Sequence, residues 1–169
     1  MSKDSGFSEE NLRRIASQKI SYRVSVKIHV AIFIVVNTLL YIMDIFYTPG
    51  LYWIIYPFFS WLIGVNMHVI GYLLYARGVP MAKRGVVYHI VSFISVMLFL
   101  FIINLTTLSE YYWVRFPAIF WGTGVILHII IYIHYFSGKA EGSGEQSSRK
   151  ERAIEKELEK MRKKQKKKN

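Results

Sequence analysis

The chain has no cysteine among its 169 residues, and this excludes disulfide bonds, thiolate metal ligands and thiol nucleophiles. Acidic side chains are nearly absent from the apolar part of the chain, where only Asp44 and Glu110 occur between residues 28 and 136. These two acids are not paired, and the sequence carries neither a phosphate-binding loop nor a nucleophile elbow. The sequence therefore predicts a protein that is not an enzyme.

The chain contains long apolar runs in place of catalytic motifs. A bilayer core of about 30 Å requires about 20 predominantly apolar residues in a helix, and backbone polar groups in lipid are satisfied only in helices or closed barrels. Four runs meet this length, which predicts an all-α membrane protein with four transmembrane helices and no soluble catalytic domain. The runs are Ile28 to Phe46, Leu51 to Tyr75, Val86 to Leu105 and Tyr112 to Phe136.

The apolar part of the chain also repeats itself at an offset of 60 residues, and 16 of the 47 pairs formed by 29–75 and 89–135 are identical. Shared hydrophobicity does not explain matched His, Trp, Pro and Gly, so we interpret the pattern as an internal duplication. It predicts two tandem helical hairpins, 28–75 and 88–136, joined by a cytoplasmic loop at 76–87. Because both hairpins start from the same side, a pseudo-twofold axis along the membrane normal is expected.

Lys and Arg near span ends remain on the cytoplasmic side of a membrane. Six such residues precede the first span, none lies in the loop around 47–50, three lie between spans two and three, and twelve follow span four. We therefore expect a multi-pass protein of the cytoplasmic (inner) cell membrane with both termini cytoplasmic. The formal net charge of +11 predicts attraction to anionic lipid at that face, whereas no fold is present that would bind nucleic acid.

Two polar segments flank the spans. Ser8, Glu9 and Glu10 resemble a helix start within residues 1–27, so this segment is expected to be a short interfacial helix or disordered. Residues 137–169 are expected to form a flexible linker followed by a basic cytoplasmic tail. The tail is a candidate binding segment for a protein partner, and the sequence leaves open whether the chain is a homo-oligomer.

Each half carries two intramembrane histidines at matched positions, His29 with His89 and His68 with His128. Helical spacing places the residues that the repeat preserves on the histidine face, which is expected to point into the bundle. Ionisable residues in spans are costly and suggest a functional site. The supporting residues on the same face are Trp61, Gly64 and Tyr72 in the first half and Trp121, Gly124 and Tyr132 in the second.

Two interpretations of these histidines stay open. In one, repeat-related imidazoles approach across the pseudo-twofold axis and hold haem b or a transition metal, with Gly64 and Gly124 permitting close approach of a helix or a flat ligand. In the other, each imidazole is a hydrogen-bonded link between helices.

Asp44 and its counterpart Asn104 are expected to close helix ends, and Pro57 and Pro117 to lie in the first turns of the returning helices.

The returning span carries a specific motif, Trp-x-x-x-Pro-x-x-x-Trp-x-x-Gly-x-x-x-His, from Trp53 to His68 and again from Trp113 to His128. Each half thereby resembles the prokaryotic two-transmembrane (2TM) domain family. The resemblance implies a small membrane module of the kind that occurs alone or joined to cytoplasmic regulatory domains. We therefore expect a sensor, assembly or regulatory role acting through the basic tail, with a haem- or metal-binding electron carrier or sensor as the alternative.

Overall fold

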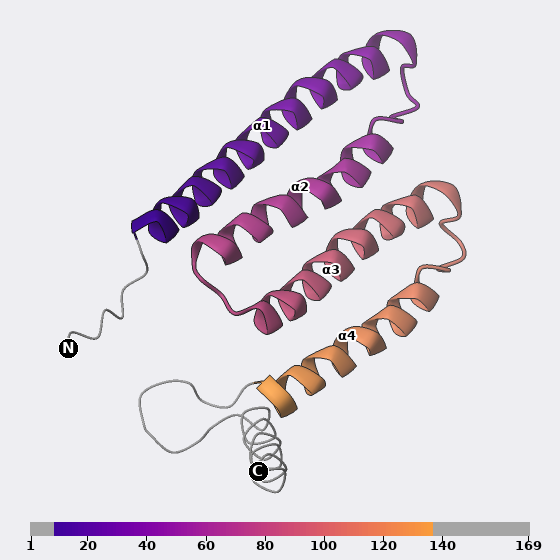
Figure 1. The fold of residues 1–169 in the computed structure, drawn as a ribbon. Coiled ribbons are helices and arrows are strands. Elements are labelled where there is room, and N and C mark those ends of the chain that lie inside the picture. The colour runs from indigo at the N-terminus through magenta and orange to yellow at the C-terminus, as the bar shows by residue number, and fades with distance from the viewer. Residues whose placement is uncertain (1–8, 137–169) are drawn as a thin grey trace, which may run out of the picture. The chain divides into compact units, whose positions relative to one another are not determined.

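A computed structural model of the chain describes residues 9–136, and the basic tail predicted from the sequence lies outside them. The described part forms four helices, and Figure 1 shows their order: α1 (Glu9–Tyr47), α2 (Ile55–Ala76), α3 (Met81–Thr107) and α4 (Arg115–Phe136). Each helix is long and apolar enough to cross a membrane. The prediction of an all-α protein with four membrane-spanning helices is confirmed.

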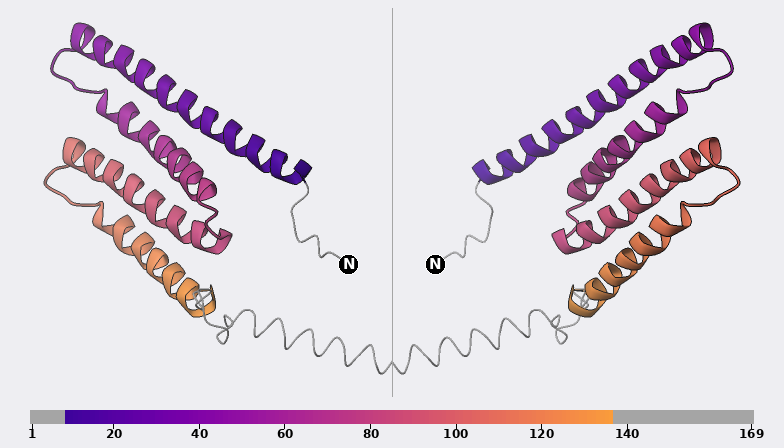
Figure 2. Two further views of the ribbon diagram at one scale, coloured as in Figure 1. Left: turned by 90° about the vertical axis from the view of Figure 1, so that its left-hand side faces the viewer. Right: turned by 90° about the vertical axis from the view of Figure 1, so that its right-hand side faces the viewer.

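The chain divides between Ala118 and Ile119 into two compact units. Helices α1, α2 and α3 belong to the first unit, where α2 packs against both α1 and α3. These three helices run antiparallel, as Figures 1 and 2 show, and the amide of Asn66 on α2 donates a hydrogen bond to Ser95 on α3 at 3.3 Å. The symmetry axis expected between the two hairpins stays a prediction.

Helix α1 is longer than the sequence-based boundary suggested. It runs without interruption from Glu9 to Tyr47, so residues 9–27 do not form a separate interfacial helix. The physical reason is that this stretch contains neither proline nor glycine, which are the residues that ordinarily end a helix. Glu9 and Glu10 lie in the first turn, where negative charge favours the helix dipole.

The connection between α2 and α3 is shorter than the predicted loop 76–87 and consists of residues 77–80. Gly78 adopts a φ of +65°, which glycine tolerates at a helix C-terminus, and its amide donates to the carbonyl of Tyr75. Pro80 then precedes the first turn of α3, a position where proline loses no helical hydrogen bond. Helix α3 consequently begins at Met81 and not at residue 88.

Few apolar side chains are buried in the first unit: Phe33, Val65, Val86 and Val114. Large apolar side chains such as Val35 and Leu39 are instead more than half exposed. This is the reverse of a water-soluble core, and it fits helices whose outer faces contact lipid.

The turns at the far ends of the two hairpins use equivalent residues. The carboxylate of Asp44 accepts a hydrogen bond from the Ile54 amide at 3.5 Å, and the side-chain oxygen of Asn104 accepts one from the Val114 amide at 3.1 Å. Both residues are buried, and both lie in the last turn of their helices. The prediction that they close helix ends is confirmed, as is the position of Pro57 and Pro117 in the first turns of α2 and α4.

Candidate functional site: a histidine cluster in the first hairpin

The histidine face of α1 lies against α2. On α1 the buried residues Phe33, Asn37 and Asp44 continue the line that begins at His29, because spacings of four and seven residues return to one side of a helix. The facing line on α2 includes Trp61 and His68, both of which contact His29. In the first hairpin, the face that the repeat preserves is therefore the interface between the two helices.

At the centre of this interface, the indole of Trp61 donates a hydrogen bond from Nε1 to Nε2 of His29 at 2.8 Å. The ring of His68 lies next to that of His29, with centroids 5.3 Å apart and planes at 80°. Nε2 of His68 and Oγ of Ser25 are 3.3 Å apart and share a hydrogen bond whose direction depends on the tautomer. Two hydrogen bonds and one ring contact thus link Trp61, His29, His68 and Ser25 across the two helices, and we call these four residues the histidine cluster.

The hydrogen bond from Trp61 determines the state of His29. An indole N–H only donates, so Nε2 of His29 must present a lone pair. An imidazole that accepts at Nε2 is neutral and carries its proton on Nδ1. Protonation would place a second N–H against the indole N–H and break the contact.

Tyrosine side chains, including Tyr22 on α1, lie next to the histidine cluster. The ring of Tyr22 lies 5.5 Å from that of His68 and 5.8 Å from that of Tyr72, and its side chain is hydrogen-bonded to that of Tyr88 on α3. Both hydroxyls lie over Gly71, where an added Cβ would collide with the Tyr22 hydroxyl and come within 3.1 Å of the Tyr88 hydroxyl. Glycine at position 71 is thus what allows α1 and α3 to reach the same point of α2.

The two supporting glycines stand differently. A Cβ on Gly64 would meet Cε1 of His29 at 4.0 Å, an ordinary contact, so the packing of α1 on α2 requires no glycine at this position. Gly124 lies in the second unit, and the expectation for it stays a prediction. Gly71, which the sequence analysis did not select because its repeat counterpart is Ile131, is the glycine that close packing requires.

The repeat-related pairing of histidines is not the one found in the first unit. His29 meets His68 of its own hairpin, while α2 lies in contact with both α1 and α3 and separates His29 from the helix of His89. The early residues of α1 also extend along α2, where Gln18 accepts a hydrogen bond from Tyr75. This register brings His29 to the same level as His68.

The second half is divided between the two units. His89 lies on α3 in the first unit, partly buried, and Trp121, Gly124, His128 and Tyr132 lie on α4 in the second unit. Tyr132 stacks on Phe136 with planes at 9° and centroids 6.2 Å apart.

The histidine cluster as it stands fits neither a haem nor a zinc ion without rearrangement. A haem iron takes its axial ligands from opposite faces, whereas Nε2 of His29 already accepts the Trp61 hydrogen bond. Structural and catalytic zinc sites use three or more protein ligands, and within residues 9–136 no three His, Asp or Glu side chains gather closely enough to hold a metal ion. A ligand bound through Nε2 of His29 would have to displace the indole.

Sequence reasoning found three members of this site and missed others. The repeat singled out His29, Trp61 and His68, because all three have identical counterparts. Ser25 and Tyr22 were missed because they precede the predicted start of the first span, and no repeat signal marks them.

Comparison with protein families agrees with the duplicated hairpin. The 2TM domain model matches residues 14–78 and again residues 81–159, so the first match begins well before the predicted boundary at residue 28, in line with the long helix α1. No curated protein and no solved structure matches the chain. Since the two matches together cover most of its length, the chain belongs to the 2TM domain family and carries the domain twice in tandem.

Proposed function

We propose that this multi-pass membrane protein is a non-enzymatic sensor module of the cytoplasmic membrane. In this proposal the histidine cluster responds to protonation, and the basic C-terminal segment is the output on the cytoplasmic side. The observation that carries the proposal is the hydrogen bond from Trp61 to Nε2 of His29, which exists only while His29 is neutral.

Protonation would change the contact between α1 and α2 in two ways. The His29 ring would lose its acceptor and oppose the indole N–H, and a positive charge would appear beside His68, 5.3 Å away between ring centroids. Charge inside a membrane span is unfavourable, so the hairpin would be expected to loosen or rotate until the imidazolium reached water. Histidine is the side chain that ordinarily changes charge between about pH 5 and pH 8.

The surroundings contain few other groups that titrate in this range. Tyr22 on α1 and Tyr72 on α2 pack around the histidines, and Tyr88 on α3 bonds to Tyr22. The guanidinium of Arg84 lies 5.5 Å over the ring of Tyr75, and arginine does not titrate in this range. A response to pH in this hairpin would therefore be attributed to the imidazoles.

The orientation rests on the distribution of Lys and Arg, which favours cytoplasmic termini. In that orientation the twelve basic residues after the fourth span lie at the anionic cytoplasmic leaflet. Deleting residues 138–169 should weaken binding of the protein to vesicles of anionic lipid, and the difference should shrink as salt rises. Equal binding of the truncated protein would contradict an output through this segment.

The test of the sensor proposal is a distance measurement across the hairpin. The chain has no cysteine, so spin labels at Ile20→Cys and Leu73→Cys, both exposed positions, report α1 against α2 in reconstituted full-length protein. We expect the distance distribution to shift by about 1–2 Å between about pH 8 and pH 5. The matched control is His29→Gln, whose amide oxygen accepts from Trp61 without titrating. An unchanged wild-type distribution, or the same shift in His29→Gln, would overturn the proposal.

A further inference from the structure

The interface between α1 and α2 changes character at the histidine cluster. Toward the end where α1 begins, it is built of hydrogen-bonding side chains: Gln18 accepts from Tyr75 at 3.2 Å, and Lys19 donates to the carbonyl of Ala76 at 3.3 Å. Toward the 48–54 turn, it is built of aromatic rings and a mostly apolar cavity. The two sides of the cluster therefore offer different environments to water and protons.

Ser25 is the exposed member of the histidine cluster. Its Oγ lies 3.3 Å from Nε2 of His68. Arg23 and Lys27 stand two residues to either side of it, and both are exposed. Long basic side chains near the end of a span keep their charge at the interface between membrane and water. Ser25 therefore lies at the level of the headgroups, within reach of water from the end where α1 begins.

The imidazoles are the groups on this part of the first unit that titrate near neutral pH. Phenol, ammonium and guanidinium groups do not change charge between about pH 5 and pH 8. His89 is the one other histidine on α1, α2 and α3. The titratable and charged side chains along this part of the packed helices are Tyr22, Arg23 and Lys27 on α1, Tyr72 and Tyr75 on α2, and Arg84, Tyr88 and His89 on α3.

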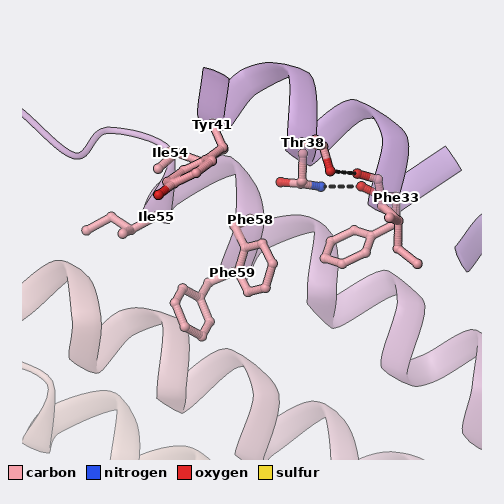
Figure 3. A pocket seen from close by; sticks show the side chains of 9 residues that line it. Phe33, Thr38, Tyr41, Ile54, Ile55, Phe58 and Phe59 are labelled. Atoms are coloured by element: carbon pink, nitrogen blue, oxygen red, sulfur yellow. Dashed lines mark hydrogen bonds between the residues drawn. The ribbon is translucent and has the colours of Figure 1, made fainter. Parts of the chain in front are cut away.

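Aromatic rings close the interface on the other side of the cluster. Phe33 follows His29 by one helical turn and is only 8% exposed. Its ring meets that of Trp61 at 6.0 Å and that of Phe58 at 5.3 Å between centroids, and Figure 3 shows Phe33 and Phe58 side by side between α1 and α2. A cavity of about 380 Å³ follows, lined mainly by isoleucine and aromatic side chains. Apolar cavities of this kind stay dry.

The polar contacts across the interface also end in this direction. Asn37 donates to the carbonyl of Phe33 in its own helix at 2.9 Å, and its Oδ1 is buried with no hydrogen-bond partner. Thr38 likewise donates to the carbonyl of Ile34 at 2.8 Å, and Figure 3 shows both bonds. Both hydrogen bonds stay within α1, so these side chains do not continue the polar contacts toward the 48–54 turn.

We propose that the histidine cluster takes up protons only from the face of the membrane that carries Gly78, which is the cytoplasmic face in the proposed orientation. Protons reach His68 from water at Ser25, whereas the packed rings of Phe33 and Phe58 and the dry cavity block the route from the opposite face. This inference rests on the proposed sensor function and names the compartment that the sensor reads, which is the cytoplasm.

The test changes the pH on one face of the membrane at a time. Full-length protein with spin labels at Ile20→Cys and Leu73→Cys, both exposed positions, is reconstituted into liposomes. Labelling of Gly78→Cys by an impermeant reagent, in liposomes prepared in the same way, gives the fraction of molecules with Gly78 outward. Preparations in which this fraction is well above one half are used, so that the two faces give different amplitudes.

Lowering only the external pH from about 8 to about 5 should shift the distance by about 1–2 Å in the fraction of molecules with Gly78 outward. Lowering only the internal pH should shift the remaining molecules. The reverse fractions, or a shift of all molecules from either face, would overturn this inference and leave the sensor intact. No shift from either face would overturn both.

Two histidine variants assign the response to the cluster. His29→Gln should abolish the shift with acid on either face, because its amide oxygen accepts from Trp61 without titrating. The matched control is His89→Gln at the repeat-related position, which should keep both the shift and its dependence on one face. Loss of the shift in His89→Gln would contradict uptake by the cluster.

A second measurement tests the route without relying on the sensor. Ser25 and Thr38 are exposed hydroxyl residues of α1 on opposite sides of the cluster, about 20 Å apart at a rise of about 1.5 Å per residue. A charged, impermeant thiol reagent added outside should label Ser25→Cys to the same extent as Gly78→Cys. It should leave Thr38→Cys unlabelled from either face. An unreactive Ser25→Cys, or labelling of Thr38→Cys from the face opposite Gly78, would overturn the proposed route.

Discussion

The turn of the second hairpin should depend on one side chain, Asn104. This residue is fully buried, and its amide nitrogen donates to the carbonyls of Leu108 at 2.7 Å and Tyr111 at 2.9 Å. Its oxygen accepts from the Val114 amide at 3.1 Å. Replacing it with leucine, which has a similar size, removes all three bonds and offers none in return.

The expected loss of stability depends on whether each hydrogen-bond partner of Asn104 can find another partner. A net contribution of about 1 kcal/mol per hydrogen bond gives about 3 kcal/mol for the three. Leu108 and Tyr111 are exposed and their carbonyls can turn to water, but Val114 is only 8% exposed. Its stranded N–H adds about 1–2 kcal/mol, so Asn104→Leu should lower the free energy of unfolding by about 4–5 kcal/mol.

The assay is equilibrium unfolding in mixed micelles, followed by circular dichroism. A matched variant, Asn104→Asp, keeps the acceptor for Val114 but places a carboxylate against two carbonyl oxygens. Because it loses both donated hydrogen bonds, Asn104→Asp should lower the free energy of unfolding by at least about 2 kcal/mol. The control is Asp44→Asn, which retains an acceptor and should change stability by about 1 kcal/mol or less. A loss below about 1 kcal/mol in Asn104→Leu, or no loss in Asn104→Asp, would refute the reasoning.

Three further predictions concern packing, topology and cofactor binding. Gly71→Ala should destabilise the first unit by about 1–3 kcal/mol because its methyl group collides with the Tyr22 hydroxyl, and Tyr22→Phe should restore part of the loss in the double variant; a neutral Gly71→Ala would contradict the close approach. Single cysteines at Gly50 and Ser109 should react with an impermeant reagent from outside, and one at Gly78 only from the cytoplasm; outside labelling at Gly78 would reverse the orientation. Protein expressed with adequate haem and metal should show neither a Soret band nor stoichiometric metal if the four repeat-matched histidines are hydrogen-bonded links; a cofactor lost on substituting one of them would establish ligation instead.

Much of the fold could be predicted from the sequence, because its signals are local or periodic. The length of an apolar run decides whether a helix crosses a bilayer, and the identity of Trp61, Gly64 and His68 with residues 60 positions later reveals the duplication without any structure. Helical spacing also identified the face of α1 that meets α2. The equivalent roles of Asp44 and Asn104 followed from their places near span ends.

The contacts within the site were decided by tertiary structure. His29 meets His68 and not His89 because α2 packs between α1 and α3, and the register of α1 on α2 follows from side-chain fit over the whole interface. The same register brings Ser25 into the histidine cluster and Tyr22 to its border, and it makes Gly71 a point of contact with both α1 and α3. A periodic sequence pattern also cannot show that an atom lacks a hydrogen-bond partner. The unpaired Oδ1 of Asn37 was therefore found only from the packed helices. The sequence alone thus determined which helices form and which faces they bury, whereas the sliding of one helix against another determined which atoms meet.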